Sequence, residues 1–178
     1  MIFNLFARKP RSPSPDALYG RIMAAARQPR LFLGRYGAPD TLEGRFDLLV
    51  LHLFPVVRRL ADMAPPAPDL AQALSDHAFL ALDRALREMG VGDLAVPKRM
   101  KKLGSDYNGR TQAYAAALPG GEDALAAAIA RNVHGSADPE RGRALARYML
   151  AVVAALEGVS CADFEAGRIA FPDPDKLG

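Results

Sequence analysis

The sequence has few of the residues from which catalytic and metal centres are built. Its 178 residues include one cysteine, Cys161, and three histidines, His52, His77 and His134. A single thiol cannot form an internal disulfide or a CxxC pair, and it fits a reducing compartment such as the cytoplasm. The histidines lack HxxxH or HExxH spacing, so one helix cannot present two of them to a metal ion. We therefore expect no metal and no cofactor, and we interpret the histidines as partly buried, hydrogen-bonded residues.

Signatures of phosphate binding and of nucleophilic catalysis are also missing. The sequence contains no GxGxxG, Walker or GxSxG motif. Gly90 and Gly92 follow a predicted helix and not a strand, so this glycine pair indicates a turn and not a dinucleotide-binding loop. The Pro- and Asp-rich stretch at 172–175 lacks the ligand spacing of a calcium loop. These absences favour a protein that binds a partner and is not an enzyme.

Long hydrophobic runs are absent as well. The longest, Leu48–Val57, is interrupted by His52 and Pro55. It is about half of the roughly 20 residues that a membrane-spanning helix needs. In residues 2–11 the apolar residues precede the basic ones, which is the reverse of a secretory signal. We expect a cytoplasmic protein, with a peripheral position at the inner face of the cytoplasmic membrane as a further expectation.

The composition is that of an ordinary globular domain. Half of the residues are hydrophobic, 24% are charged, and the formal net charge is +3. A chain of this length can bury a sufficient core without disulfides or metal ions. We expect a flexible, basic and proline-rich segment over residues 1–15, one helical domain over 16–168, and a flexible polar tail over 169–178.

Apolar residues recur at helical spacing along most of the chain, with no long strand-like alternation. This pattern predicts an all-α fold, a single compact multi-helix domain, with helices over residues 16–28, 41–63, 69–89, 97–118, 122–133 and 139–157. The helix over 41–63 is apolar nearly all round, which is typical of a central helix. We expect Pro55 to kink or split it. We expect Gly104 and Gly109 to mark a break or a close crossing in the helix over 97–118.

The best candidate for a binding surface is a basic corner between two predicted helices. Gly90, Gly92 and Asp93 form the turn. The helix that follows it begins with a ridge of cations, Lys98, Arg99, Lys101 and Lys102. The aromatic residues of this helix fall on its opposite, apolar side, so the interleaving typical of nucleic-acid surfaces is missing. The ridge therefore suits an acidic protein surface or a lipid headgroup layer, or it serves solubility alone.

A second candidate surface lies on the predicted central helix. Arg45, His52 and Arg59 are seven residues apart, so they follow one strip of the helix. The strip is either a polar groove for a partner's carboxylates and carbonyls, or an exposed margin of the core helix. Asp47 points elsewhere, and a buried carboxylate at that position requires a cationic partner, which the sequence pattern does not identify.

Three stretches of the sequence resemble the ubiquinol–cytochrome c chaperone family. They are DALYGRIMAAARQPRLF, GAPDTLEGRFDLLVLHLFPVVRRL and LREMGVGDLAVPKRMKKL, and the likeness extends over about residues 16–156. The resemblance implies an all-helical, non-enzymatic assembly factor for ubiquinol–cytochrome c reductase that binds newly made cytochrome b. It also implies a binding surface over residues 44–49, with Arg45 and Asp47, and over the corner at 90–102. The compact chain is expected to be a bacterial relative of the mitochondrial factor.

The expected partner is nascent or unassembled cytochrome b, and no DNA is expected. The membrane surface is a second expected partner, and the ribosome, with which mitochondrial members of the family work, is a third. An alternative function is that of an RNA- or ribosome-associated helical adaptor. Such an adaptor would bind with an affinity that falls steeply as salt is added.

Overall fold

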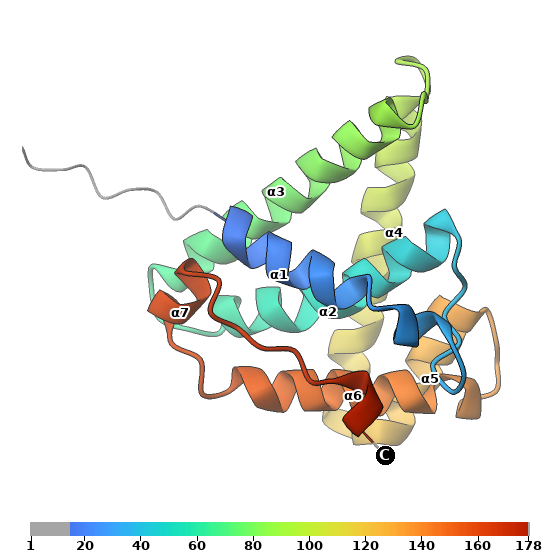
Figure 1. Cartoon of the computed structure of the whole chain (residues 1–178), viewed down its shortest axis with the longest axis vertical. Helices are drawn as coiled ribbons and strands as arrows, with labels where there is room; N and C mark the ends of the chain where they lie inside the picture. The colour runs from blue at the N-terminus through green and yellow to red at the C-terminus, as the bar shows by residue number, and fades with distance from the viewer. Residues whose placement is uncertain (1–14, 178) are drawn as a thin grey trace, which may run out of the picture.

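The computed structural model describes residues 15–177, and within that range it is helical with no strand (Figure 1). In chain order the elements are α1 (Asp16–Ala26), η1 (Pro29–Phe32), α2 (Leu42–Ala61), α3 (Ala67–Glu88), α4 (Val96–Ala117), η2 (Leu118–Gly120), α5 (Gly121–His134), α6 (Glu140–Leu156), α7 (Cys161–Glu165) and η3 (Pro174–Lys176). The predicted all-α fold is confirmed. The predicted flexible segment over 1–15 lies almost entirely outside the described residues and stays a prediction.

The apolar helix α2 lies at the centre of the fold, as its sequence predicts. It begins after Thr41, whose side-chain oxygen accepts a hydrogen bond from the Gly44 backbone nitrogen at 3.1 Å. Its residues on every side are buried, and α1, α3 and α6 pack against it. The helix continues through the buried Pro55, so the predicted split does not occur. Packing on both halves of α2 outweighs the backbone hydrogen bond that proline removes.

Helices α5 and α6 cross closely at Gly142. At Gly142 of α6, an added Cβ atom would lie 2.2 Å from the Ala126 carbonyl oxygen and 2.6 Å from the Ala130 nitrogen. By contrast, a Cβ at Gly104 or Gly109 would meet nothing within 4 Å, and α4 runs unbroken through both. The prediction that these two glycines mark a break or a close crossing is therefore wrong, because neither faces a packed neighbour.

We expect the substitution Gly142→Ala to lower the free energy of unfolding by about 1–3 kcal/mol. The new methyl group would overlap backbone atoms of α5, which can yield only if the two helices move apart. Urea unfolding followed by circular dichroism measures the effect. Gly158→Ala is the control, since a Cβ there enters open space, and it is expected to change stability by less than about 0.5 kcal/mol. Equal stabilities of the two variants would contradict the crossing.

Residues 169–177 lie against the body of the protein and do not form the predicted loose tail. Ile169 and Pro174 are buried. The Tyr36 hydroxyl donates a hydrogen bond to the Pro174 carbonyl oxygen at 2.7 Å, and the Phe171 ring lies 5.4 Å from the His52 ring. Figure 1 shows this last segment, in dark red, crossing in front of α6. The polar composition of this segment predicted a loose tail, but its apolar residues and its backbone carbonyls contact the rest of the protein.

Helices α3 and α4 form a hairpin whose far end projects beyond the rest of the protein (Figure 1). The first half of α3 is anchored in the core through Leu70, Leu74 and Ala78. Most residues of its second half are exposed or half-buried. The helix ends just before Gly90, as predicted, and the φ of +80° at Gly90 favours glycine. The basic corner of the sequence is therefore the outer end of this hairpin.

Candidate functional site

A cavity of about 260 Å³ opens between the N-terminal end of α2, the second half of α3 and α4 from Arg99 to Arg110. We call it the hairpin groove. Its apolar lining consists of Leu42, Phe46, Leu82, Ala85, Leu86, Met89 and Leu103. Its charged lining consists of Glu43, Arg99, Lys102, Asp106 and Arg110. The groove thus combines an apolar floor with an edge on which cations outnumber acids.

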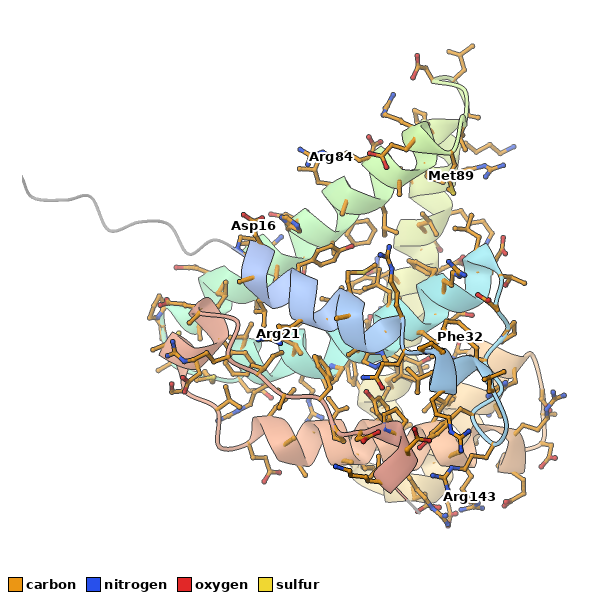
Figure 2. The ribbon with its side chains drawn as sticks, viewed as in Figure 1. Asp16, Arg21, Phe32, Arg84, Met89 and Arg143 are labelled. Atoms are coloured by element: carbon orange, nitrogen blue, oxygen red, sulfur yellow. The ribbon has the colours of Figure 1, made fainter. Side chains whose placement is uncertain are left out.

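The apolar floor comes mainly from one stripe of α3. Leu82, Leu86 and Met89 recur every three or four residues, so they share one face of the helix. Leu86 is buried, but Met89 remains 54% exposed, and Leu42 of α2 remains 48% exposed. Figure 2 shows Met89 on the side of α3 that faces α4. A row of apolar side chains that is only partly covered is typical of a partner-binding surface.

The cationic edge comes from α4. Arg99 and Lys102 are three residues apart, so they lie on the same side of the helix, and both line the groove. The Lys102 ammonium forms an exposed ion pair with Asp106 at 2.5 Å. Within residues 15–177 the structure gives Arg99 no ion pair, so its guanidinium can bind a carboxylate of a partner.

A buried ion pair joins α2 to α4 at the base of the groove. Arg110 Nε lies 2.6 Å from Asp47 Oδ1, and the Arg110 guanidinium lies over the Phe46 ring, 5.5 Å from its centre. Asp47 is buried, and burial raises the pKa of its carboxyl to about 6, although the Arg110 charge opposes this shift. Arg110 is the cationic partner that the sequence pattern required and did not identify.

The predicted strip on α2 does not form one surface. Arg45 is exposed and pairs with Asp40 at 2.7 Å, outside the groove lining. Arg59 lies at the other end of α2 and donates hydrogen bonds to backbone carbonyls at the end of α6, at 2.9 and 3.3 Å. His52, between them, is fully buried. The prediction of a continuous polar groove or exposed margin is therefore wrong at His52, because α6 and the C-terminal segment cover it.

The predicted basic corner divides into two parts. Gly90, Gly92 and Asp93 form the exposed outer turn, where Asp93 pairs with Arg87 at 2.7 Å. In the ridge that follows, Arg99 and Lys102 line the groove, whereas Lys98 and Lys101 are exposed outside its lining. The structure therefore brings two of the four predicted cations to the apolar residues of α2 and α3.

Residues 15–177 contain no group of three or more His, Cys, Asp or Glu side chains arranged to hold a metal ion. Among these same residues, no helix has the length and apolar character needed to cross a membrane.

Comparison with known proteins identifies the family to which this chain belongs. The family described as "Ubiquinol-cytochrome C chaperone" matches residues 35–171, which include every residue that lines the groove. The crystal structure of the Cbp3 homolog from Brucella abortus is similar to this chain, with a TM-score of 0.83, 38% sequence identity and coverage of 100% of both chains. The comparison with curated proteins gives no match. Because the family match extends over most of its length, the chain belongs to the ubiquinol–cytochrome c chaperone family.

Proposed function

We propose that this ubiquinol–cytochrome c chaperone holds cytochrome b before its assembly, and that an apolar helix of cytochrome b binds in the hairpin groove. The observation that carries the proposal is the half-open apolar stripe of α3 beside the cations of α4. The proposed complex is a non-enzymatic one, in which the chaperone covers apolar surface until the client meets its partner subunits.

The groove suits the helix-in-groove mode of recognition. In that mode, an amphipathic helix inserts side chains spaced three and four residues apart into an apolar cleft. A volume of about 260 Å³ accommodates a few such side chains and not a whole helix. An unassembled membrane subunit exposes apolar helices with polar or charged ends. Arg99 and Lys102 can then bind carboxylates or carbonyls at the end of a helix whose apolar residues contact Leu86 and Met89.

The substitution Met89→Glu is expected to reduce cytochrome b capture at least about ten-fold, since it places a carboxylate on the apolar floor. A tagged chain is used to isolate partners from detergent-solubilised membranes of the native host, and cytochrome b is quantified by mass spectrometry. Leu80→Glu is the matched control. Leu80 is on the same helix and is 50% exposed, against 54% for Met89, but it does not line the groove.

A pair of charge reversals tests the cationic edge in the same experiment. Arg99→Glu with Lys102→Glu changes two cations that line the groove, and Lys98→Glu with Lys101→Glu changes two that do not. Both pairs alter the net charge equally and lie on the same helix. We expect the first pair to lose more cytochrome b than the second. Capture that survives Met89→Glu would remove the groove from the proposal, and ribosomal proteins or RNA recovered without cytochrome b would favour the adaptor function instead.

A further inference from the structure

We propose that the outer end of the hairpin docks on an anionic lipid surface, with Leu94 inserted among the lipids. We call this end, residues 83–102, the hairpin tip. The proposal uses residues outside the groove lining, Leu94, Lys98 and Lys101 above all, and does not depend on what the groove binds.

Leu94 is the apolar element of the hairpin tip. Its side chain is 99% exposed, in the turn between α3 and α4. A backbone hydrogen bond of 2.8 Å from Ala95 nitrogen to the Gly92 carbonyl oxygen closes the turn and holds Leu94 at its outside. Figure 1 shows this turn as the part of the described chain farthest from the body. A large apolar side chain displayed at an apex costs hydration free energy that burial in a partner or a lipid layer recovers.

The hairpin tip also carries a concentrated positive charge. It holds six Lys and Arg residues against three Asp and Glu, a net charge of +3, which equals the net charge of all 178 residues. Two of the acids, Asp83 and Asp93, are paired with Arg87, each at 2.7 Å. Glu88 is the remaining acid. Arg84, Lys98, Arg99 and Lys101 are exposed and stand outside these pairs, whereas Lys102, also exposed, pairs with Asp106 of α4.

The cations are placed to meet phosphate groups while Leu94 enters the acyl region. At 1.5 Å per residue, Lys98 to Lys102 lie within about 9 Å of the start of α4. Arg84 and Met89 lie on opposite sides of the last turns of α3 (Figure 2). An apolar apex with cations on both adjoining helices resembles an interfacial anchor, in which apolar side chains enter the acyl boundary and basic side chains extend to the headgroups.

The composition of the tip favours lipid over the other anionic or apolar partners. Residues 83–102 contain no Phe, Tyr or Trp, so no ring is available to stack on the bases of a single-stranded RNA. A second copy of the chain, docked tip to tip, would bring two charges of +3 together. A membrane-bound tip also sets the hairpin groove beside the bilayer, where an unassembled membrane subunit is found.

A single tryptophan tests the insertion directly, because the natural sequence contains none. Full-length chain with Leu94→Trp is mixed with vesicles of phosphatidylcholine, with or without phosphatidylglycerol. We expect co-sedimentation and a blue shift of Trp emission with the anionic vesicles, and neither with the neutral ones. Leu33→Trp is the control, since Leu33 is 57% exposed but lies outside the hairpin. It should bind the same vesicles without a blue shift.

Two variants without tryptophan measure how much Leu94 and the two lysines each contribute to vesicle binding. Leu94→Ser is expected to weaken binding to anionic vesicles about ten-fold. Lys98→Gln with Lys101→Gln should weaken it about thirty-fold at low salt, whereas Leu33→Ser leaves it unchanged. The Leu94→Ser variant should still capture cytochrome b from detergent-solubilised membranes. Failure of the lipid proposal can therefore be told apart from failure of the proposed function. Absence of vesicle binding, binding without a shift at position 94, binding unaffected by Leu94→Ser, or binding to single-stranded RNA in place of vesicles would each overturn the proposal.

Discussion

Arg110→Met is expected to lower the free energy of unfolding by about 3–5 kcal/mol at about pH 8. The guanidinium of Arg110 lies 2.6 Å from Asp47, and only 7% of the Asp47 side chain is exposed. Without Arg110, the carboxylate of Asp47 has no cation beside it in an apolar setting. The substitution also changes the candidate site, because Arg110 lines the hairpin groove and its ion pair with Asp47 joins α4 to α2 at the base of the groove.

The loss should depend on pH in a defined direction. Burial raises the pKa of Asp47 to about 6, above its ordinary value near 4, so the folded protein binds this proton more tightly than the unfolded chain. Stability linked to Asp47 is therefore highest below about pH 4 and declines as the pH rises through 6. Removing Arg110 raises the pKa further. The variant should then be nearly as stable as the parent at about pH 5 and much less stable at about pH 8.

Two further variants identify the cause. Adding Asp47→Asn to Arg110→Met removes the unpaired carboxylate, so it should restore most of the stability and abolish the pH dependence of the loss. Arg87→Met removes an exposed arginine with two exposed or half-buried acidic partners, and should cost less than about 1 kcal/mol at every pH. Urea unfolding at a series of pH values measures all of these. A loss from Arg110→Met that is the same at pH 5 and pH 8 would contradict the assignment.

The helices could be predicted because their ends carry local signals. Thr41 accepts a backbone hydrogen bond at the start of α2, and Gly90 follows the end of α3 in a left-handed conformation. The close crossing at Gly142 has no such signal, because its neighbours on α5 are alanines whose spacing says nothing about the distance to α6. The contacts of the C-terminal segment were missed for a related reason. They are made across the fold, with Tyr36 in the connector before α2 and with His52 of α2.

The candidate site could be predicted only in part. The cations Arg99 and Lys102 were found because they stand together in the sequence. The apolar floor was not found, although periodicity showed that Leu82, Leu86 and Met89 share a face of α3. Periodicity identifies an apolar face without showing what covers it. Here the first half of α3 is buried in the core, and the second half stays partly open. This difference follows from the packing of several helices and not from any one helix.

His52 is the second group whose titration should affect stability strongly. It is fully buried, and its Nδ1 lies 2.7 Å from the Leu48 carbonyl oxygen. A carbonyl only accepts, so Nδ1 carries the proton and Nε2 accepts from the Tyr148 hydroxyl at 3.0 Å. Burial lowers the pKa of His52 to about 4, so the imidazole is neutral in the folded protein under ordinary conditions.

Acid should therefore destabilise the fold through His52. Between about pH 6.5 and pH 4 the unfolded chain binds a proton at this residue and the folded protein does not, so the free energy of unfolding should fall by up to about 3 kcal/mol. Asp47 acts in the opposite direction over nearly the same range, because its pKa is raised. The two effects offset each other in the parent protein, whose own pH curve consequently reveals neither.

The comparison that isolates His52 is therefore with His52→Gln. A glutamine amide can donate to Leu48 and accept from Tyr148, yet it does not titrate, and Asp47 cancels in the difference between the two proteins. We expect the stability of the parent relative to this variant to fall by about 3 kcal/mol as the pH drops from about 7 to 4. Tyr148→Phe should lower stability by about 1–3 kcal/mol at neutral pH while keeping a dependence on pH, since it removes the hydroxyl and leaves the imidazole. If the difference in stability between the parent and His52→Gln stayed constant with pH, His52 would titrate alike in the folded and unfolded states. That result would contradict the lowered pKa of His52 in the folded protein.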